Sequence, residues 1–92
     1  MVPELTLYSR EYCHLCHDMI AALEVLQQRY RFSLTVVDVD ADEALEERLG
    51  ELVPVLMAGE VEICHYHLDL RAFKAFMESR RLPESQQAES SP

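Results

Sequence analysis

Residues 13–16 are Cys13-His14-Leu15-Cys16, a pair of cysteines separated by two residues. The apolar stretch from Leu5 to Tyr8 predicts a short strand, and apolar residues then recur at helical intervals from Cys16 to Tyr30. The cysteine pair is therefore expected at a strand-to-helix junction. The first N–H groups of a helix have no partner inside the helix and carry partial positive charge, which favours a thiolate at Cys13.

The two thiols are expected to differ in reactivity. Arg10, and also His14 and His17 when they are protonated, add to the positive potential at Cys13, whereas Glu11 opposes it. Cys16 stands one turn further along the helix, on its apolar side. We therefore expect Cys16 to be more buried and less reactive than Cys13.

A second feature is Val53-Pro54, which opens another predicted strand. Two cysteines at the head of a helix, faced by a proline from elsewhere in the chain, are the working parts of a thiol-disulfide site. The sequence thus points to sulfur chemistry before any other property is considered.

The rest of the chain divides into short elements. A strand is predicted over Phe32 to Val39, followed by a helix that Asp40 caps and that stops at Gly50. A hairpin with Gly59-Glu60 at its turn and a last helix capped by Asp69 follow. The hairpin strands are Val55 to Ala58 and Val61 to His65, and the buried stripe of the last helix is Leu70, Phe73, Phe76 and Met77. The order is β-α-β-α-β-β-α, and its first crossover predicts parallel strands.

Length and composition limit the classes of protein that fit. The 92 residues support one domain, which we place at residues 1–82, and the polar residues 83–92 are expected to form a disordered tail. With 17 acidic and 8 basic residues the formal charge is −9, which argues against nucleic acid or an anionic membrane as the main partner. No segment is long and apolar enough for a membrane span, and the start of the chain lacks a secretory pattern, so we expect a cytoplasmic protein. We also expect it to be a monomer. Three cysteines are an odd number for a disulfide framework, and in a reducing compartment a close pair is typical of catalysis or metal binding.

The element order, the dithiol after the first strand and the Val-Pro that opens the third strand together resemble the thioredoxin superfamily, and within it the small bacterial glutaredoxin-like proteins. The resemblance covers about residues 4 to 81. It implies an α/β thioredoxin/glutaredoxin fold with a four-stranded mixed sheet and helices on both faces. It also implies a thiol-disulfide oxidoreductase without a resident cofactor, acting on a protein disulfide or a glutathione mixed disulfide.

The resemblance assigns roles to particular residues. Cys13 would attack the substrate and Cys16 would resolve the mixed disulfide, while Pro54 would be a cis proline and Val53 would offer its backbone to an extended substrate. Arg10 matches a basic residue that helps to hold a glutathione carboxylate, and Asp69 matches a ligand of the glutathione amino group. From its position alone, Tyr12 either flanks the substrate groove or packs.

Two departures from the glutaredoxin pattern concern glutathione. His14-Leu15 replaces the usual Pro-Tyr between the cysteines, and the bulky segment Ile63 to Asp69 stands where glutaredoxins carry a Gly-Gly pair before the last helix. Bulky side chains in place of glycines obstruct a close approach to the backbone. Glutathione turnover is therefore expected to be much lower than in an ordinary glutaredoxin.

Alternative chemistries share the same residues. Cys13 to His17 also matches the C-x-x-C-H pattern of covalent haem attachment. Zinc is a stronger rival, because the predicted topology brings Cys64, His65 and His67 to the same edge of the sheet as the cysteine pair, and thiolate and imidazole suit zinc. Against a metal, strand alternation turns the two histidines to one face and Cys64 to the other. A redox-inactive interaction module is the third possibility.

We interpret the remaining candidates conservatively. Cys64 is taken as a small apolar packing residue, and His65 and His67 as loop and strand-end residues without an acid-base role. No metal ligand is assigned.

Overall fold

The computed structural model describes residues 2–81, so the predicted tail at residues 83–92 lies outside the described residues. The elements are β1 (Glu4–Ser9), α1 (His14–Leu26), β2 (Ser33–Asp38), the 3-10 turn η1 (Val39–Ala41), α2 (Glu43–Leu49), β3 (Val55–Ala58), β4 (Val61–His65) and α3 (Leu70–Arg81). The predicted order β-α-β-α-β-β-α is confirmed.

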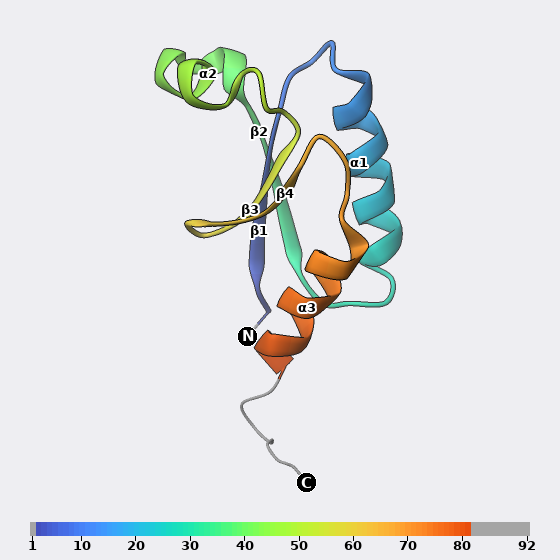
Figure 1. The fold of residues 1–92 in the computed structure, drawn as a ribbon. Helices are drawn as coiled ribbons and strands as arrows, with labels where there is room; N and C mark the ends of the chain where they lie inside the picture. Colours follow the sequence, from blue (N-terminus) through green and yellow to red (C-terminus); the bar gives the residue numbers. More distant parts are fainter. Residues whose placement is uncertain (1, 82–92) are drawn as a thin grey trace, which may run out of the picture.

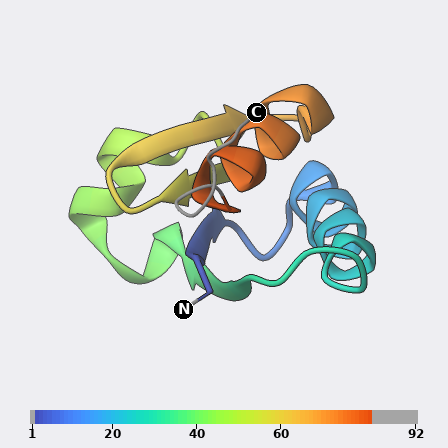
Figure 2. The same cartoon turned by 90° about the horizontal axis from the view of Figure 1, so that it is seen from below.

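The four strands form one mixed sheet in the order β2-β1-β3-β4. β1 is parallel to β2 and antiparallel to β3, and β3 is antiparallel to β4. Figures 1 and 2 show α1 and α3 on one face of this sheet and α2 on the other, near the end of the molecule where α1 begins. The predicted α/β fold with helices on both faces is therefore confirmed.

Most of the core lies between the sheet and the pair α1 and α3. Leu5 and Leu7 alternate with outward residues along β1 and are 1% and 0% exposed. They pack with Met19 and Leu23 of α1, which recur at helical spacing, and with Phe73 of α3. This face fixes α1, and hence the cysteine pair at its start, against the carboxyl end of β1.

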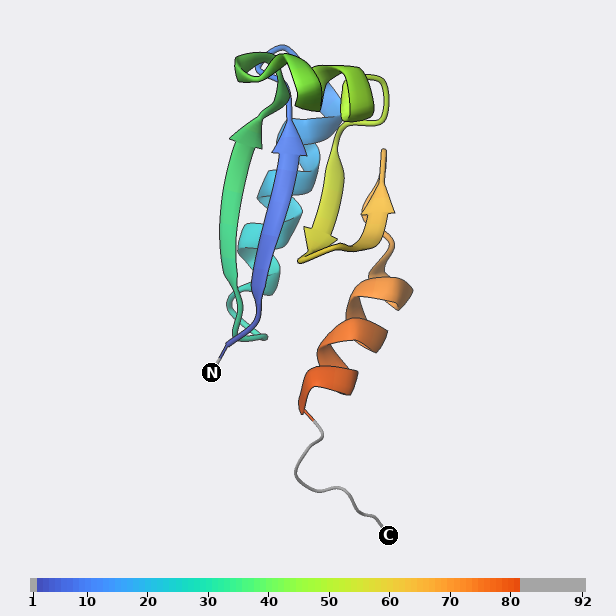
Figure 3. The same cartoon turned by 90° about the vertical axis from the view of Figure 1, so that its left-hand side faces the viewer.

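A smaller apolar cluster lies at the end of the sheet that carries the cysteines. Cys16, Val39 and Val53 form its buried part, and Tyr8, Cys13, Leu45 and Leu49 pack around it. α2 covers this cluster, although every side chain of α2 stays at least partly exposed. The thiol site is thus built on the contact between the β1–α1 junction, η1, α2 and the start of β3 (Figure 3).

The start of the second predicted helix needs a correction. Asp40 was expected to cap one helix, but the chain forms η1 first, and α2 then begins at Glu43 with Asp42 as its cap. Asp42 Oδ1 accepts the Ala44 N–H at 2.9 Å, while the Asp40 carboxylate turns to Arg10. The Asp40 side chain therefore forms a tertiary ion pair with Arg10 and does not cap the helix, as its sequence context would favour.

Among residues 2–81, the structure contains no helix of the length and hydrophobicity that a membrane crossing requires.

Candidate active site

The cysteine pair forms a disulfide across the first turn of α1. Cys13 is the N-cap residue and Cys16 follows within the helix, with their Cα atoms 5.2 Å apart. Cys13 Sγ accepts the Cys16 backbone N–H at 3.1 Å, so one of the free donors at the helix start is directed at this sulfur. Cys13 is half-buried, whereas Cys16 is 0% exposed. Only Cys13 can meet a substrate from outside.

Val53 and Pro54 lie beside this pair. Val53 belongs to the same buried cluster as Cys16, and the Val53–Pro54 peptide bond is cis. The Pro54 carbonyl accepts the Tyr66 N–H at 2.9 Å, which joins the start of β3 to the segment that follows β4. Three segments distant in sequence therefore meet at the dithiol.

The segment between β4 and α3 has an irregular backbone at Tyr66. This residue has a φ of 66°, in the left-handed region, which costs a non-glycine residue about 1–2 kcal/mol. Its phenol donates to the Glu51 carbonyl at 3.2 Å, and its ring contacts the His65 ring edge to face at 4.7 Å. Sequence reasoning noted the bulk of this segment but missed Tyr66 as an individual residue, because no local pattern predicts a left-handed tyrosine.

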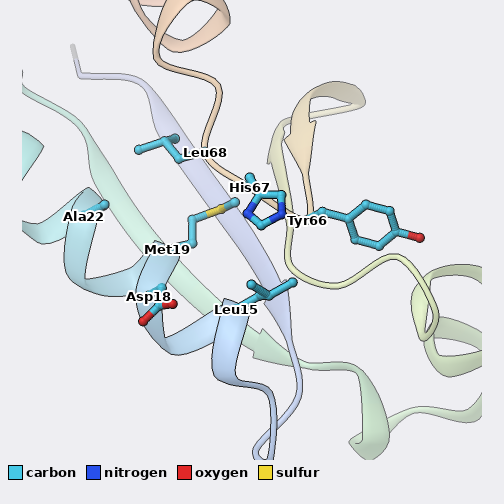
Figure 4. Close-up of a pocket in the computed structure, with 7 residues that line it drawn as sticks. All are labelled: Leu15, Asp18, Met19, Ala22, Tyr66, His67 and Leu68. Carbon is cyan, nitrogen blue, oxygen red and sulfur yellow. The ribbon is translucent and has the colours of Figure 1, made fainter.

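A hollow of about 150 Å³ opens between α1 and this segment. It is lined by Leu15, Asp18, Met19, Ala22, Tyr66, His67 and Leu68. Figure 4 shows the His67 ring beside Met19 and Leu15, while the Tyr66 ring points away from α1. Leu15, which directly precedes Cys16 in the Cys-x-x-Cys motif, is the lining residue nearest to the dithiol in sequence.

Arg10 is held within the protein rather than extended over the dithiol. Its Nη2 lies 2.9 Å from Asp40 Oδ1 and 3.0 Å from Glu46 Oε2, and its Nη1 donates to the Gly50 carbonyl at 3.2 Å. These contacts join the β1–α1 junction to η1 and α2. The role of Arg10 as a ligand for a substrate carboxylate stays a prediction, and such a substrate would compete with two carboxylates already in place.

The other two predicted substrate residues lie in different surroundings. Tyr12, directly before Cys13, is 93% exposed. It therefore does not pack within this chain, and its other expected role, at the edge of a substrate groove, stays a prediction. Asp69 is confirmed as the cap of α3, since its Oδ1 accepts the Ala72 N–H at 3.1 Å. Whether Asp69 also binds a substrate amino group stays a prediction.

Cys64 and the histidines do not join the dithiol in a ligand set. Cys64 is 8% exposed in the main core, and burial raises the pKa of its thiol. His65 Nδ1 lies 2.6 Å from Glu62, and His14 Nε2 lies 3.4 Å from Asp18. Within residues 2–81, no three or more Cys, His, Asp or Glu side chains are arranged to hold a metal ion.

Comparison with known proteins agrees with this geometry. The sequence matches the model of a family described as Glutaredoxin-like domain (DUF836), over residues 4–78. The chain belongs to this family. No curated protein matches the sequence.

Solved structures extend the family assignment. The glutaredoxin-like domain is 42% identical to Protein Ne2328 from Nitrosomonas europaea, over 84% of this chain and 93% of that one, with a TM-score of 0.77. It is 35% identical to target protein XcR50 from X. campestris, over 82% of this chain and 96% of that one, with a TM-score of 0.62. Thioredoxin 1 from Thermosipho africanus shares the fold at 15% identity, with a TM-score of 0.59 over 85% of this chain and 98% of that one. The predicted glutaredoxin-like family and the predicted thioredoxin fold are confirmed.

Proposed function

We propose that the protein is a dithiol-disulfide oxidoreductase in which Cys13 and Cys16 carry the redox chemistry. The observation that supports this most directly is the asymmetry of the pair. Cys13 is accessible and lies at the helix N-terminus, whereas Cys16 is bonded to it and fully enclosed. An attacking thiol needs access, and a resolving thiol needs only to reach its neighbour.

The reaction proceeds in two exchanges. The Cys13 thiolate attacks one sulfur of a substrate disulfide, a mixed disulfide forms, and the other substrate sulfur leaves as a thiolate that takes up a proton. Cys16 loses its proton as it attacks Cys13 Sγ, the Cys13–Cys16 disulfide forms, and the second substrate thiolate leaves and takes up that proton. Two electrons pass from the dithiol to the substrate, and a thiol reductant returns the protein to its starting state by the reverse exchange.

The helix start favours the first exchange. The free N–H groups at a helix N-terminus stabilise a nearby anion by about 0.3–2 kcal/mol, and the Cys16 N–H already points at Cys13 Sγ at 3.1 Å. The same groups stabilise the Cys13 thiolate when it leaves in the reverse of the first exchange. In the resolving step the leaving group is the substrate thiolate, so the helix start acts on the first exchange.

Substrate would lie across the exposed side of Cys13. Val53 supplies backbone groups next to the dithiol, Tyr12 supplies an exposed ring, and the hollow at Leu15 receives a side chain. A substrate carboxylate would have to compete with Asp40 and Glu46 for Arg10, whereas a substrate amino group could donate to the Asp69 oxygen that does not accept the Ala72 N–H. We propose a protein disulfide as the main substrate, with glutathione mixed disulfide as a weaker one.

The test is a redox titration in glutathione buffers, with the products identified by mass spectrometry. The unmodified protein should show one two-electron transition, Cys13→Ser should show none, and Cys16→Ser should stop at a mixed disulfide on Cys13. Cys64→Ser is the matched control and should behave as the unmodified protein. A chain that forms no disulfide or adduct at Cys13 would instead be a redox-inactive interaction module.

The setting of this activity is also a proposal. We propose that the protein acts as a cytoplasmic monomer without a resident cofactor. A cysteine pair that alternates between dithiol and disulfide is consistent with this proposal, and the third thiol, Cys64, is buried in the core. Sedimentation of the purified protein and its metal content after purification without chelator test the monomer and the absence of a metal.

A further inference from the structure

Two side chains with large apolar parts, those of the exposed Tyr12 and the partly buried Leu15, flank Cys13 along the chain and are here called the apolar patch. Tyr12 is 93% exposed immediately before Cys13, and Leu15 follows within the Cys-x-x-Cys motif at the edge of the hollow. Tyrosine supplies a large, rigid contact area and is enriched at protein interfaces. This patch therefore offers a contact surface next to the atom that reacts.

Carboxylates stand around the patch. Glu11 precedes Tyr12, and Asp18 lines the hollow. Glu51 lies two residues before Val53, and its carbonyl oxygen accepts the hydrogen bond from the Tyr66 phenol. The side chains of Glu11 and Glu51 are exposed.

The charge of the whole chain is concentrated at this end. The β1–α1 junction, η1 and α2 lie together there (Figures 1 and 3). The two segments that build it, residues 10–18 and 38–51, contain nine acidic and two basic residues, whereas the rest of residues 2–81 contains six of each. The nine are Glu11, Asp18, Asp38, Asp40, Asp42, Glu43, Glu46, Glu47 and Glu51, and the two are Arg10 and Arg48.

We propose that this patch docks a protein partner whose reactive cysteine is flanked by basic residues, and that it disfavours anionic disulfides such as glutathione disulfide. This inference rests on the proposed function and names the substrate class of the same site. The apolar patch makes the contact, and the surrounding carboxylates select the partner by charge complementarity. Clefts and surfaces of one sign raise the encounter rate of an oppositely charged ligand by about 10- to 1,000-fold at low salt.

The first test compares three small disulfides of similar length. Cystamine carries two ammonium groups, bis(2-hydroxyethyl) disulfide is neutral, and dithiodiglycolate carries two carboxylates. The rate at which each oxidises the reduced protein is measured at low and high salt. We expect the ratio of the cystamine rate to the dithiodiglycolate rate to be largest at low salt and to fall as salt screens the carboxylates.

Charge-reversal variants isolate the residues responsible. Glu11→Lys/Glu51→Lys should lower the cystamine-to-dithiodiglycolate ratio about tenfold at low salt. The control Glu24→Lys/Glu78→Lys changes the net charge equally but outside the two segments, and its ratio should stay within about twofold of the unmodified protein. Differences in leaving group and in Cys13 nucleophilicity cancel, because each variant is compared with the unmodified protein through a ratio.

A second test addresses the kind of partner. Peptide disulfides with Lys on both sides of the cysteine should react faster than otherwise identical peptides with Glu, and Glu11→Lys/Glu51→Lys should reverse that order. An unchanged ratio in this variant, while Cys13 is still oxidised, would overturn the inference and leave the proposed function standing. A preference for cystamine without any preference among the peptides would overturn the assignment to a protein partner. Failure of all the disulfides to oxidise Cys13 would instead overturn the proposed function.

Discussion

Cys64 and Cys13 show how one residue type acquires two chemistries from its surroundings. Cys13 lies at a helix start and is accessible, whereas Cys64 is 8% exposed in the core. Burial raises the pKa of the Cys64 thiol above its ordinary value of 9.0, because the charged form loses its hydration. Access and burial therefore distinguish Cys13, the proposed attacking thiol, from Cys64.

Limited alkylation of the reduced protein at neutral pH should label Cys13 first, with Cys16 and Cys64 slow, because the thiolate is the species that reacts. Mass spectrometry of digested samples taken over time gives the order. Labelling of Cys64 before Cys13 would show that the assigned roles are wrong.

The same pKa shift predicts how stability depends on pH. Because the thiol of Cys64 titrates at higher pH in the folded protein than in the unfolded chain, it binds more protons in the folded state above about pH 9. The contribution of the protonated Cys64 thiol to the free energy of unfolding is therefore complete below the pKa of the unfolded chain and is lost as the pH rises through the pKa of the folded protein. Urea unfolding at neutral pH and at about pH 10 should show a smaller alkaline loss in Cys64→Ala than in the unmodified protein. An equal loss in both would mean that the thiol is not shielded.

Ser9 is a buried residue whose hydroxyl no sequence pattern singles out. It is 7% exposed at the end of β1, and among the described residues its hydroxyl has no hydrogen-bond partner. A buried polar group without a partner costs about 1–3 kcal/mol. Ser9→Ala should therefore leave the free energy of unfolding unchanged or raise it by about 1 kcal/mol, as measured by urea titration. The exposed Ser33→Ala should stay within about 0.5 kcal/mol, and a loss above about 1 kcal/mol in Ser9→Ala would reveal a hydrogen bond of that hydroxyl.

At the scale of elements, the end of α2 depends on a close approach that the sequence alone does not show. Gly50 has a helical φ of −56°, a conformation in which Gly→Ala usually stabilises a protein by about 0.4–1 kcal/mol. A Cβ at Gly50, however, would lie 2.5 Å from the Glu46 carbonyl oxygen and 2.9 Å from Arg10 Nη2. The Glu46 carbonyl, which accepts the Gly50 N–H at 2.8 Å, therefore leaves no room for a side chain here, and the Arg10 guanidinium crowds the same space.

Gly50→Ala should accordingly destabilise the protein by about 1–3 kcal/mol, the range for forcing an extra carbon into a filled space. The second glycine provides a contrast, because Gly59 has a φ of 63° and open space around it. Gly59→Ala should cost about 1–2 kcal/mol through backbone strain alone. Addition of Arg10→Met to Gly50→Ala should recover little of the loss, because the tighter contact is with the Glu46 carbonyl oxygen. A Gly50→Ala protein as stable as the parent would contradict this account.

The same elements show what sequence patterns can predict. Alternation along β1 and helical spacing after Cys16 reflect burial on one side of each element, so the order of elements and the place of the dithiol followed from them. The cap of α2 and the partners of Arg10 did not follow, because they depend on ion pairs between segments 30 or more residues apart. The left-handed Tyr66 likewise owes its backbone to the Pro54 carbonyl and the Glu51 turn, which are distant in sequence.

At the scale of the whole molecule, the net charge is expected to affect stability. The chain has a formal charge of −9, and most of that charge lies around η1 and α2, where carboxylates repel one another. Between about 0.01 M and about 1 M NaCl the Debye length falls from about 30 Å to about 3 Å, so salt screens this repulsion. The free energy of unfolding should therefore rise with salt, by an amount on the order of 1 kcal/mol. Glu47→Gln/Glu51→Gln should reduce that rise more than Glu24→Gln/Glu78→Gln, since only the first pair lies within the crowded segments. Equal salt dependence in the two double variants would mean that the charge acts evenly over the molecule. A free energy of unfolding that falls with salt would mean that ion pairs such as Arg10 with Asp40 outweigh the repulsion.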